Sequence, residues 1–304
     1  MLLALLMPAL LAVEPIVMPE ATANDFYSYM QEAIDEEDWW AAVDFGEVVL
    51  YNFPTSPLAQ EIPFQVGQAY LKMGQFELAN KTLTHYLHEA RSPKYFEEAL
   101  AYKLQIAEFF REGGKRRLFG SHKMPAIMPA EDEALEIYDE IIATLPHHEM
   151  AARALLGKGK IQAQIEAFKE SVESLQLLIR RFPAHELAAD AYLHINRVYL
   201  EQCKVEHLDP DLLDLAQMNL RKFQQAFPRD ARIAQAHAAW TEMTELFAAA
   251  LFETGEFYER TKKPAASTIY YRKILNSYPE SPSALKARER LNELDPPHEE
   301  VDSH

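Results

Sequence analysis

The segment VGQAYLKMGQFELANKTLTHY, residues 66–86, has the pattern of two helices that pack closely on each other. Its apolar residues recur three and four positions apart, which is the spacing of one face of an α-helix. Gly67 lets the first helix approach its partner closely, and Gly74 suits the turn because glycine adopts left-handed backbone geometry without strain. Phe76 and the small Ala79 then seat the second helix. This segment predicts a helical hairpin.

Proline marks where such hairpins end. Because proline lacks an amide hydrogen and disfavours helical geometry in the residue before it, an aromatic residue or leucine followed by proline should end a helix. These sites are Phe53-Pro54, Leu145-Pro146, Phe182-Pro183, Phe227-Pro228 and Tyr278-Pro279. Serine followed by proline, which suits a capped helix start, occurs at Ser56-Pro57, Ser92-Pro93 and Ser281-Pro282. No segment alternates as a strand would.

The repeat length indicates the fold. The first two serine–proline pairs lie 36 residues apart, and a period of 34 to 36 residues built of two helices is the tetratricopeptide spacing. The same register recurs at Phe26, Ala42, Val49 and Pro54, at Leu155, Gly159, Phe168, Leu175 and Pro183, and at Leu251, Gly255, Tyr258, Tyr271, Ile274 and Pro279. The sequence therefore predicts an all-α, tetratricopeptide-like α-α superhelix, a solenoid of about six helical hairpins.

Two repeats are longer than the others. Residues 112–130 separate the two helices of the third hairpin, and the segment around Cys203 to Pro210 lengthens the fifth. Arg232 to Arg260 contains no helix breaker and predicts one helix of about 29 residues, about 43 Å long. The predicted division is a signal-like apolar segment (1–23), N-terminal repeats with a basic insertion (24–150, insertion 112–130), C-terminal repeats (151–294) and a flexible acidic tail (295–304).

Composition excludes several classes of protein. The 304 residues carry a net charge of −17, and the first 71 contain eleven acidic residues and no lysine or arginine. Such a surface repels phosphate backbones, so nucleic acid is not an expected partner. One cysteine, Cys203, excludes an internal disulfide framework, and nine glycines without a glycine-rich turn disfavour phosphate-binding loops.

The N-terminus favours export. Leu2 to Val13 is an unbroken apolar run, too short for a transmembrane helix but suited to a secretory signal, and Ala21-Thr22-Ala23 has the small-x-small pattern of a cleavage site. No basic residue precedes the run, which a start site assigned too late would explain. The alternative is an apolar strap that packs on the first helices.

Catalytic and metal sites find little support, and we expect neither an enzyme nor a cofactor. His147-His148-Glu149 lacks the second histidine of a zinc site, and Cys203 with His207 supplies only two ligands. Glu36-Glu37-Asp38 lacks the alternating ligands of a calcium loop and predicts a capped turn. The aromatic pairs Trp39-Trp40, Phe109-Phe110 and Tyr270-Tyr271 are each expected to place at least one ring in a hairpin core.

Two candidate partner-binding sites emerge. The first helices of the N-terminal hairpins are expected to line a concave groove with Tyr27, Gln31, Phe64, Gln68, Lys72, Lys103 and Arg111, a mixture that suits an extended peptide. The second candidate is GGKRRLFGSHKM, residues 113–124, where Lys115, Arg116, Arg117 and Lys123 flank Leu118 and Phe119. It is interpreted either as a docking loop for a partner or membrane surface, or as a solvated insertion.

The chain resembles the BamD family, the tetratricopeptide lipoproteins of the machinery that assembles β-barrels in bacterial outer membranes. The resemblance is carried by FQQAFPRDARIAQA, by the long helix, by GEFYERTKKPAASTIYYRKILNSYPESPSALKA and by YNFPTSPLAQEIPFQVGQAYLKMGQFELANKTLTHYLHEA. It implies a periplasmic scaffold whose N-terminal repeats, here Tyr27 to Arg111, bind barrel-precursor signals. It also implies that the C-terminal repeats, Phe252 to Arg290, dock the central barrel protein. The family's lipidated cysteine is absent near residues 13–24, and an extra hairpin lies around Ala151 to Pro183.

We therefore expect a non-catalytic, exported scaffold of the periplasm or the inner face of the outer membrane in a Gram-negative-type bacterium. Its expected partners are outer-membrane assembly subunits and unfolded barrel precursors or their signals, with peripheral membrane association through those partners. The alternative is a periplasmic chaperone or cell-envelope adaptor outside the barrel-assembly machinery. An enzyme would need an acid, base or nucleophile set that the sequence does not supply.

Overall fold

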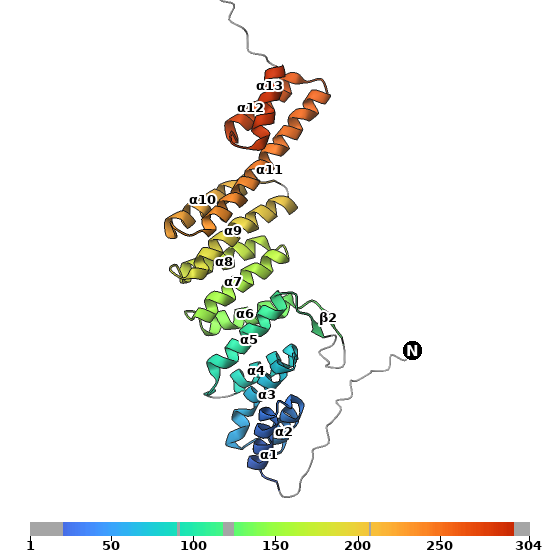
Figure 1. The fold of residues 1–304 in the computed structure, drawn as a ribbon, viewed down its shortest axis with the longest axis vertical. Coiled ribbons are helices and arrows are strands. Elements are labelled where there is room, and N and C mark those ends of the chain that lie inside the picture. The colour runs from blue at the N-terminus through green and yellow to red at the C-terminus, as the bar shows by residue number, and fades with distance from the viewer. Residues whose placement is uncertain (1–20, 90–91, 118–124, 207, 295–304) are drawn as a thin grey trace, which may run out of the picture. The chain divides into compact units, whose positions relative to one another are not determined.

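The computed structural model describes residues 21–89, 92–117, 125–206 and 208–294. Over these ranges the chain forms six consecutive pairs of α-helices followed by one further helix, with a single short strand pair (Figure 1). The predicted all-α fold of tetratricopeptide-like hairpins is confirmed. The chain divides into two compact units, residues 1–137 and 138–304, and the division falls inside the sixth α-helix. The signal-like run within residues 1–20 and the acidic tail 295–304 lie outside the described residues.

The first unit contains the N-terminal hairpins. Its elements are α1 (Ala23–Asp35), α2 (Trp39–Asn52), the 3-10 helix η1 (Pro57–Gln60), α3 (Ile62–Lys72), α4 (Phe76–Glu89), α5 (Phe96–Arg111), β1 (Arg116–Arg117), β2 (Ala126–Met128) and the start of α6 (Glu131–Thr144). Each of the helices α1 to α4 packs on the next helix, so α3 contacts both α2 and α4. The first helices of the hairpins are α1, α3 and α5.

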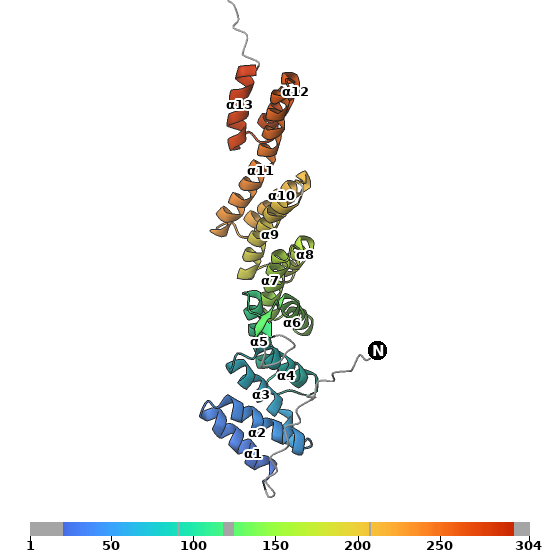
Figure 2. The same cartoon turned by 90° about the vertical axis from the view of Figure 1, so that its right-hand side faces the viewer.

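The second unit contains the remaining hairpins. Its helices are α7 (Glu149–Gln164), α8 (Phe168–Arg181), α9 (Glu186–Val205), α10 (Pro210–Ala226), α11 (Arg232–Arg260), α12 (Pro264–Ser277) and α13 (Pro282–Leu294). The long helix α11 has the predicted bounds, and it packs on α9 and α10 with one part and on α12 and α13 with the other. Figure 2 shows α11 extending from α10 towards α12 and α13.

Four hairpins share one turn. The second residue after the first helix is left-handed in each, with φ of 58° at Glu37, 67° at Gly74, 62° at Glu166 and 58° at Lys262. The amide of the following residue then donates to the carbonyl five residues back, at 2.8–2.9 Å, which is the Schellman arrangement. Only Gly74 has the residue that this geometry favours, so the other three turns carry backbone strain.

Close helix contact is made by a glycine and a large side chain sixteen residues apart. A Cβ atom on Gly67, Gly159 or Gly255 would lie 2.8 Å from Leu83, 2.7 Å from Leu175 or 2.5 Å from Tyr271. Gly46 on α2 makes its close contact with the next hairpin instead, because a Cβ atom there would lie 2.8 Å from Val66 on α3. The predicted close approach at Gly67 therefore recurs in three of the described hairpins.

Most predicted helix ends are confirmed. Helices α2, α8, α10 and α12 end at the predicted residues before proline, which are Phe53, Phe182, Phe227 and Tyr278. Ser56 and Ser281 accept hydrogen bonds from the amides of Leu58 and Ala284 and so cap as expected. The predicted start at Ser92-Pro93 is wrong, because α5 begins at Phe96. The amide of Tyr95 donates to the Tyr86 hydroxyl at 2.9 Å, which holds this segment on α4 before the helix begins.

The insertion also departs from the expectation that no strand occurs. Its described parts form an antiparallel pair in which Arg116 lies opposite Met128. The Arg117 amide donates to a carboxylate oxygen of Glu77 on α4, so this strand pair is fixed on a helix.

At the N-terminus, Thr22 caps α1, and the helix begins at Ala23. The domain boundary after residue 150 stays a prediction.

Candidate functional site

Three of the predicted groove residues lie together on the first helices of the first unit. Gln31 on α1 donates to Gln65 on α3 at 3.1 Å, and Gln65 donates to the Tyr27 hydroxyl at 3.4 Å. Gln68 on α3 donates to the Tyr102 hydroxyl on α5 at 3.1 Å. Each bond joins residues 34 or 38 positions apart and so connects neighbouring hairpins. We call these five residues the tyrosine–glutamine surface.

This surface retains hydrogen-bonding capacity. A glutamine amide offers two donors and one acceptor group, and each of the three amides donates only once in the bonds above. All five side chains are half-buried, so their free polar atoms can reach a ligand. The arrangement can bind the N–H and C=O groups of an extended chain laid across α1, α3 and α5.

Cations lie at two edges of the surface. Lys94 is exposed, with Nζ 4.8 Å from the centre of the Tyr95 ring, and the Tyr95 hydroxyl raises the pKa of Lys94. Lys72 is exposed in the last turn of α3. Arg111 is different, because its guanidinium pairs with Glu108 at 2.6 Å and with Glu112 at 2.9 Å. Lys72 and Lys94 can therefore meet an anionic group, whereas carboxylates of its own chain already surround Arg111.

Two predicted groove residues are buried and do not line an open surface. Phe64 is 6% exposed and stacks on Tyr95 with ring centres 4.4 Å apart. Lys103 is 1% exposed, and its ammonium donates to the Thr84 hydroxyl on α4. The prediction is wrong here because α5 also packs on α4, which covers the side of α5 that carries Lys103.

The sequence analysis missed Gln65, Lys94, Tyr95 and Tyr102. A signal for two of them was present, since Gln65 and Tyr102 lie one repeat length, 34 residues, after Gln31 and Gln68. Lys94 and Tyr95 precede α5, in the segment where the helix start was misplaced.

The basic insertion is described only in part. Lys115 is exposed and Arg116 and Arg117 are half-buried, while Leu118, Phe119 and Lys123 lie outside the described residues. Burial raises the pKa of Glu133, and the charge of Arg116 acts in the opposite direction. The arginines therefore lie near carboxylates of the first unit, and a docking role for this loop stays a prediction.

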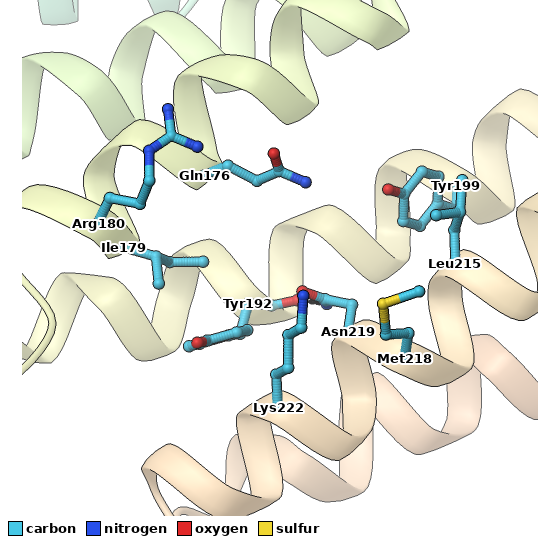
Figure 3. A pocket seen from close by; sticks show the side chains of 9 residues that line it. All are labelled: Gln176, Ile179, Arg180, Tyr192, Tyr199, Leu215, Met218, Asn219 and Lys222. Atoms are coloured by element: carbon cyan, nitrogen blue, oxygen red, sulfur yellow. Dashed lines mark hydrogen bonds between the residues drawn. The ribbon is translucent and has the colours of Figure 1, made fainter.

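The second unit contains a groove that the sequence analysis did not predict. Its walls come from α8 and α10 and its floor from α9, and it encloses about 290 Å³ (Figure 3). We call it the α8–α10 groove, and it is lined by Gln176, Ile179, Arg180, Tyr192, Tyr199, Leu215, Met218, Asn219 and Lys222. It involves the second helices of two hairpins, whereas the tyrosine–glutamine surface lies on first helices.

The floor of this groove is held by a buried network. Asn219 donates to the Tyr192 carbonyl at 2.8 Å and to Asn196 Oδ1 at 2.7 Å, and Asn196 donates to the Ala236 carbonyl at 3.1 Å. The Tyr192 ring stacks on Phe223 with centres 5.4 Å apart. Burial raises the pKa of Tyr192 and of Tyr199 on α9, so both hydroxyls stay protonated at neutral pH.

Other predicted features have structural roles. Burial raises the pKa of the Cys203 thiol to about 11, and His148 and Asp38 cap α7 and α2. Phe110 and Tyr271 are core residues as expected, but the tryptophan pair is not, since Trp40 is 46% exposed and Trp39 half-buried.

Within the part of the chain that the structure describes, no group of three or more histidine, cysteine or acidic residues could hold a metal ion. In the same residues, no helix combines the length and apolar character needed to cross a membrane. His207, the proposed companion of Cys203, lies outside them.

Comparison with known proteins supports the repeat. The tetratricopeptide-repeat family matches residues 249–281, which cover the end of α11, all of α12 and the turn after it. The match is limited to this segment, and the helical hairpins of the other described residues share its tetratricopeptide-like fold. No curated protein matches it.

Solved structures with a similar fold include MamA, at 15% identity over 69% of this chain and 94% of that chain, with a TM-score of 0.40. YrrB, described as a tetratricopeptide protein with an unusual peptide-binding site, covers 71% of this chain and 92% of its own at 13% identity, with a TM-score of 0.41. A tetratricopeptide protein from Parabacteroides merdae covers 90% and 98% at 12% identity, with a TM-score of 0.38.

Proposed function

We propose that this protein is a non-catalytic scaffold that binds an extended peptide segment of a partner on the tyrosine–glutamine surface. The observation that carries the proposal is the set of amide–hydroxyl bonds across α1, α3 and α5, which aligns free donors and acceptors along successive hairpins. Lys72 and Lys94 supply positive charge at its edges for a carboxylate of the bound segment.

The finer proposal is that the scaffold acts in outer-membrane β-barrel assembly as a BamD-like component of the periplasm or the inner face of the outer membrane. Support comes from the sequence resemblance, and the family match at residues 249–281 overlaps the part of it that includes GEFYERTKKPAASTIYYRKI. The alternative is a periplasmic chaperone or cell-envelope adaptor outside that machinery, which would use the same surface.

Peptide binding can be tested with a fluorescent peptide from the C-terminus of a β-barrel precursor, made with a free or an amidated end. Replacing Gln65 and Gln68 by alanine should weaken binding at least tenfold, because both amides lie at the centre of the surface. Gln105→Ala, an exposed glutamine on α5, is the matched control and should leave binding unchanged. Equal affinity of the double variant and the control would refute the proposed site.

The cellular role needs a separate experiment. Co-purification of the chain with a barrel-assembly protein from its native host supports the BamD-like role, and its absence under conditions that preserve that machinery supports the adaptor. Mass spectrometry of the mature protein tests export, since cleavage after Ala23 predicts a terminus at Asn24. An intact Met1 would contradict the proposed compartment.

A further inference from the structure

The α8–α10 groove is positively charged on an acidic protein. Arg180 projects from α8 and Lys222 from α10, on opposite sides of the groove (Figure 3), and no lining residue is acidic. Both side chains are exposed, and within the described residues neither makes an ion pair or a hydrogen bond.

Some other cations of this unit are neutralised by nearby carboxylates. Arg232 pairs with Asp190 at 2.8 Å and with Asp230 at 2.6 Å, and Lys204 pairs with Glu201 at 3.1 Å and Glu242 at 2.9 Å. The net charge of the whole chain is −17. Two unpaired cations facing one apolar groove therefore mark a local reversal of sign, which is the electrostatic complement of an acidic ligand.

The groove also exposes apolar surface. Leu215 and Met218 on α10 are 40% and 47% exposed, and Ile179 on α8 is half-buried. A volume of about 290 Å³ is at the lower limit of small-molecule sites. The space suits one or two anchoring side chains of a longer segment that continues beyond the groove. Methionine adapts its shape to such anchors.

The floor fixes these groups in place. Both donors of Asn219 are used by Tyr192 and Asn196, which orients the Asn219 side chain at the base of the groove. The rings of Tyr192 and Tyr199 are buried, but their hydroxyls make no hydrogen bond within the described residues. These hydroxyls are additional donors for a carboxylate.

We propose that the α8–α10 groove docks an acidic peptide segment, which inserts an apolar side chain against Leu215 and Met218 and pairs its carboxylates with Arg180 and Lys222. Arginine can hold a carboxylate through two parallel N–H bonds, whereas lysine acts as a point charge. This site is independent of the tyrosine–glutamine surface, because it lies in the other unit, on second helices, and selects by charge.

The test uses the full chain and a labelled, end-blocked peptide of sequence EEDLLEED, measured by fluorescence anisotropy at low salt. Wild-type protein should bind it at least tenfold more tightly than the serine version EEDSSEED or the basic version KKRLLKKR. The variant R180E/K222E should lose at least tenfold in affinity, and Met218→Asp should lose a comparable amount. K169E/R229E changes the charge equally at exposed sites outside the groove and should retain binding.

Rescue separates binding from folding. If R180E/K222E keeps the wild-type circular dichroism and binds KKRLLKKR in place of the acidic peptide, the charge-pairing proposal is supported. Equal losses in R180E/K222E and K169E/R229E, or failure of the wild type to prefer the acidic peptide, would overturn it. Analytical sedimentation gives a further test of the acidic-peptide proposal. A wild-type dimer that Met218→Asp converts to a monomer would contradict it, because a second copy of the chain would then fill the groove.

Discussion

The tyrosine–glutamine surface and the α8–α10 groove are built from the same type of hairpin but differ in how their polar groups are satisfied. On the first, glutamine amides bond to tyrosine hydroxyls one repeat away and no unpaired charge lies among the five residues. In the second, the amide of Asn219 is used inside the floor, while Arg180 and Lys222 on the walls are unpaired.

One type of helical hairpin can therefore present two kinds of recognition chemistry. First helices bring equivalent positions of neighbouring repeats together, so that polar side chains form a ladder suited to a peptide backbone. Second helices leave a groove between them whose floor is a first helix, so that exposed side chains on its walls face one another across a gap. We therefore expect the tyrosine–glutamine surface to bind a peptide through its backbone N–H and C=O groups. We expect the α8–α10 groove to bind a peptide through its charged side chains.

The largest expected effect comes from removing the ring under each surface. Phe223 is fully buried below the groove and Phe64 below the tyrosine–glutamine surface, and each replacement by alanine should cost about 3–5 kcal/mol of its own unit's stability. Hydrogen exchange followed by mass spectrometry should show faster exchange in residues 138–304 for F223A and in residues 1–137 for F64A. Faster exchange throughout the chain for either variant would contradict the expectation that the two units unfold separately.

The next effect compares the two amides. Asn219→Ala leaves the buried Tyr192 carbonyl and Asn196 Oδ1 without their donor and should cost about 1–3 kcal/mol. Gln65→Ala removes bonds that water can replace at a half-buried site and should cost less than about 1 kcal/mol. Urea unfolding of both variants measures the difference. Equal losses of unfolding free energy would show that the Gln65 hydrogen bonds stabilise the fold as much as those of Asn219 do.

Salt should separate the two binding modes by a smaller amount. Raising sodium chloride from 50 to 500 mM should weaken the acidic peptide at the groove by about tenfold, about 1.4 kcal/mol, because screening acts on exposed charge pairs. Binding of an amidated peptide to the tyrosine–glutamine surface should change by less than about twofold. Anisotropy titrations at both salt concentrations test this, and equal salt dependence would remove the distinction.

The smallest effect lies in the turns, which the two units share. Glu37→Gly and Glu166→Gly relieve left-handed strain at equivalent turns and should each stabilise the protein by up to about 1 kcal/mol, with no change in either binding affinity. Gly74→Ala should destabilise it by about the same amount. Thermal unfolding measures both directions, and destabilisation by the glycine variants would show that the side chains at these turns matter more than their backbone.

Much of the fold could be predicted because its determinants are local. Proline after an aromatic residue stops a helix whatever surrounds it, so the ends at Phe53, Phe182 and Phe227 follow from the chain alone. The start at Ser92-Pro93 failed because a tertiary hydrogen bond, from the Tyr95 amide to Tyr86, competes with the local signal.

The site was predicted less completely than the fold. Tyr27, Gln31 and Gln68 were assigned to one surface from helical register alone, and they do lie together. Helical register does not say which side of a first helix its neighbours cover, and for that reason Phe64, covered by Tyr86 and Tyr95, and Lys103, covered by α4, were misplaced. The α8–α10 groove had no sequence signal, since Arg180 and Lys222 lie on different helices at unrelated positions of the repeat.

The amino-acid order alone predicts the helical period, most helix ends and the glycine positions at which paired helices touch, because each depends on residues within one hairpin. Only the folded chain shows which polar groups are partners, that Lys103 is buried, and that Arg180 and Lys222 face one groove without an acidic partner. Those outcomes depend on contacts between hairpins, and such contacts join residues that are distant along the chain.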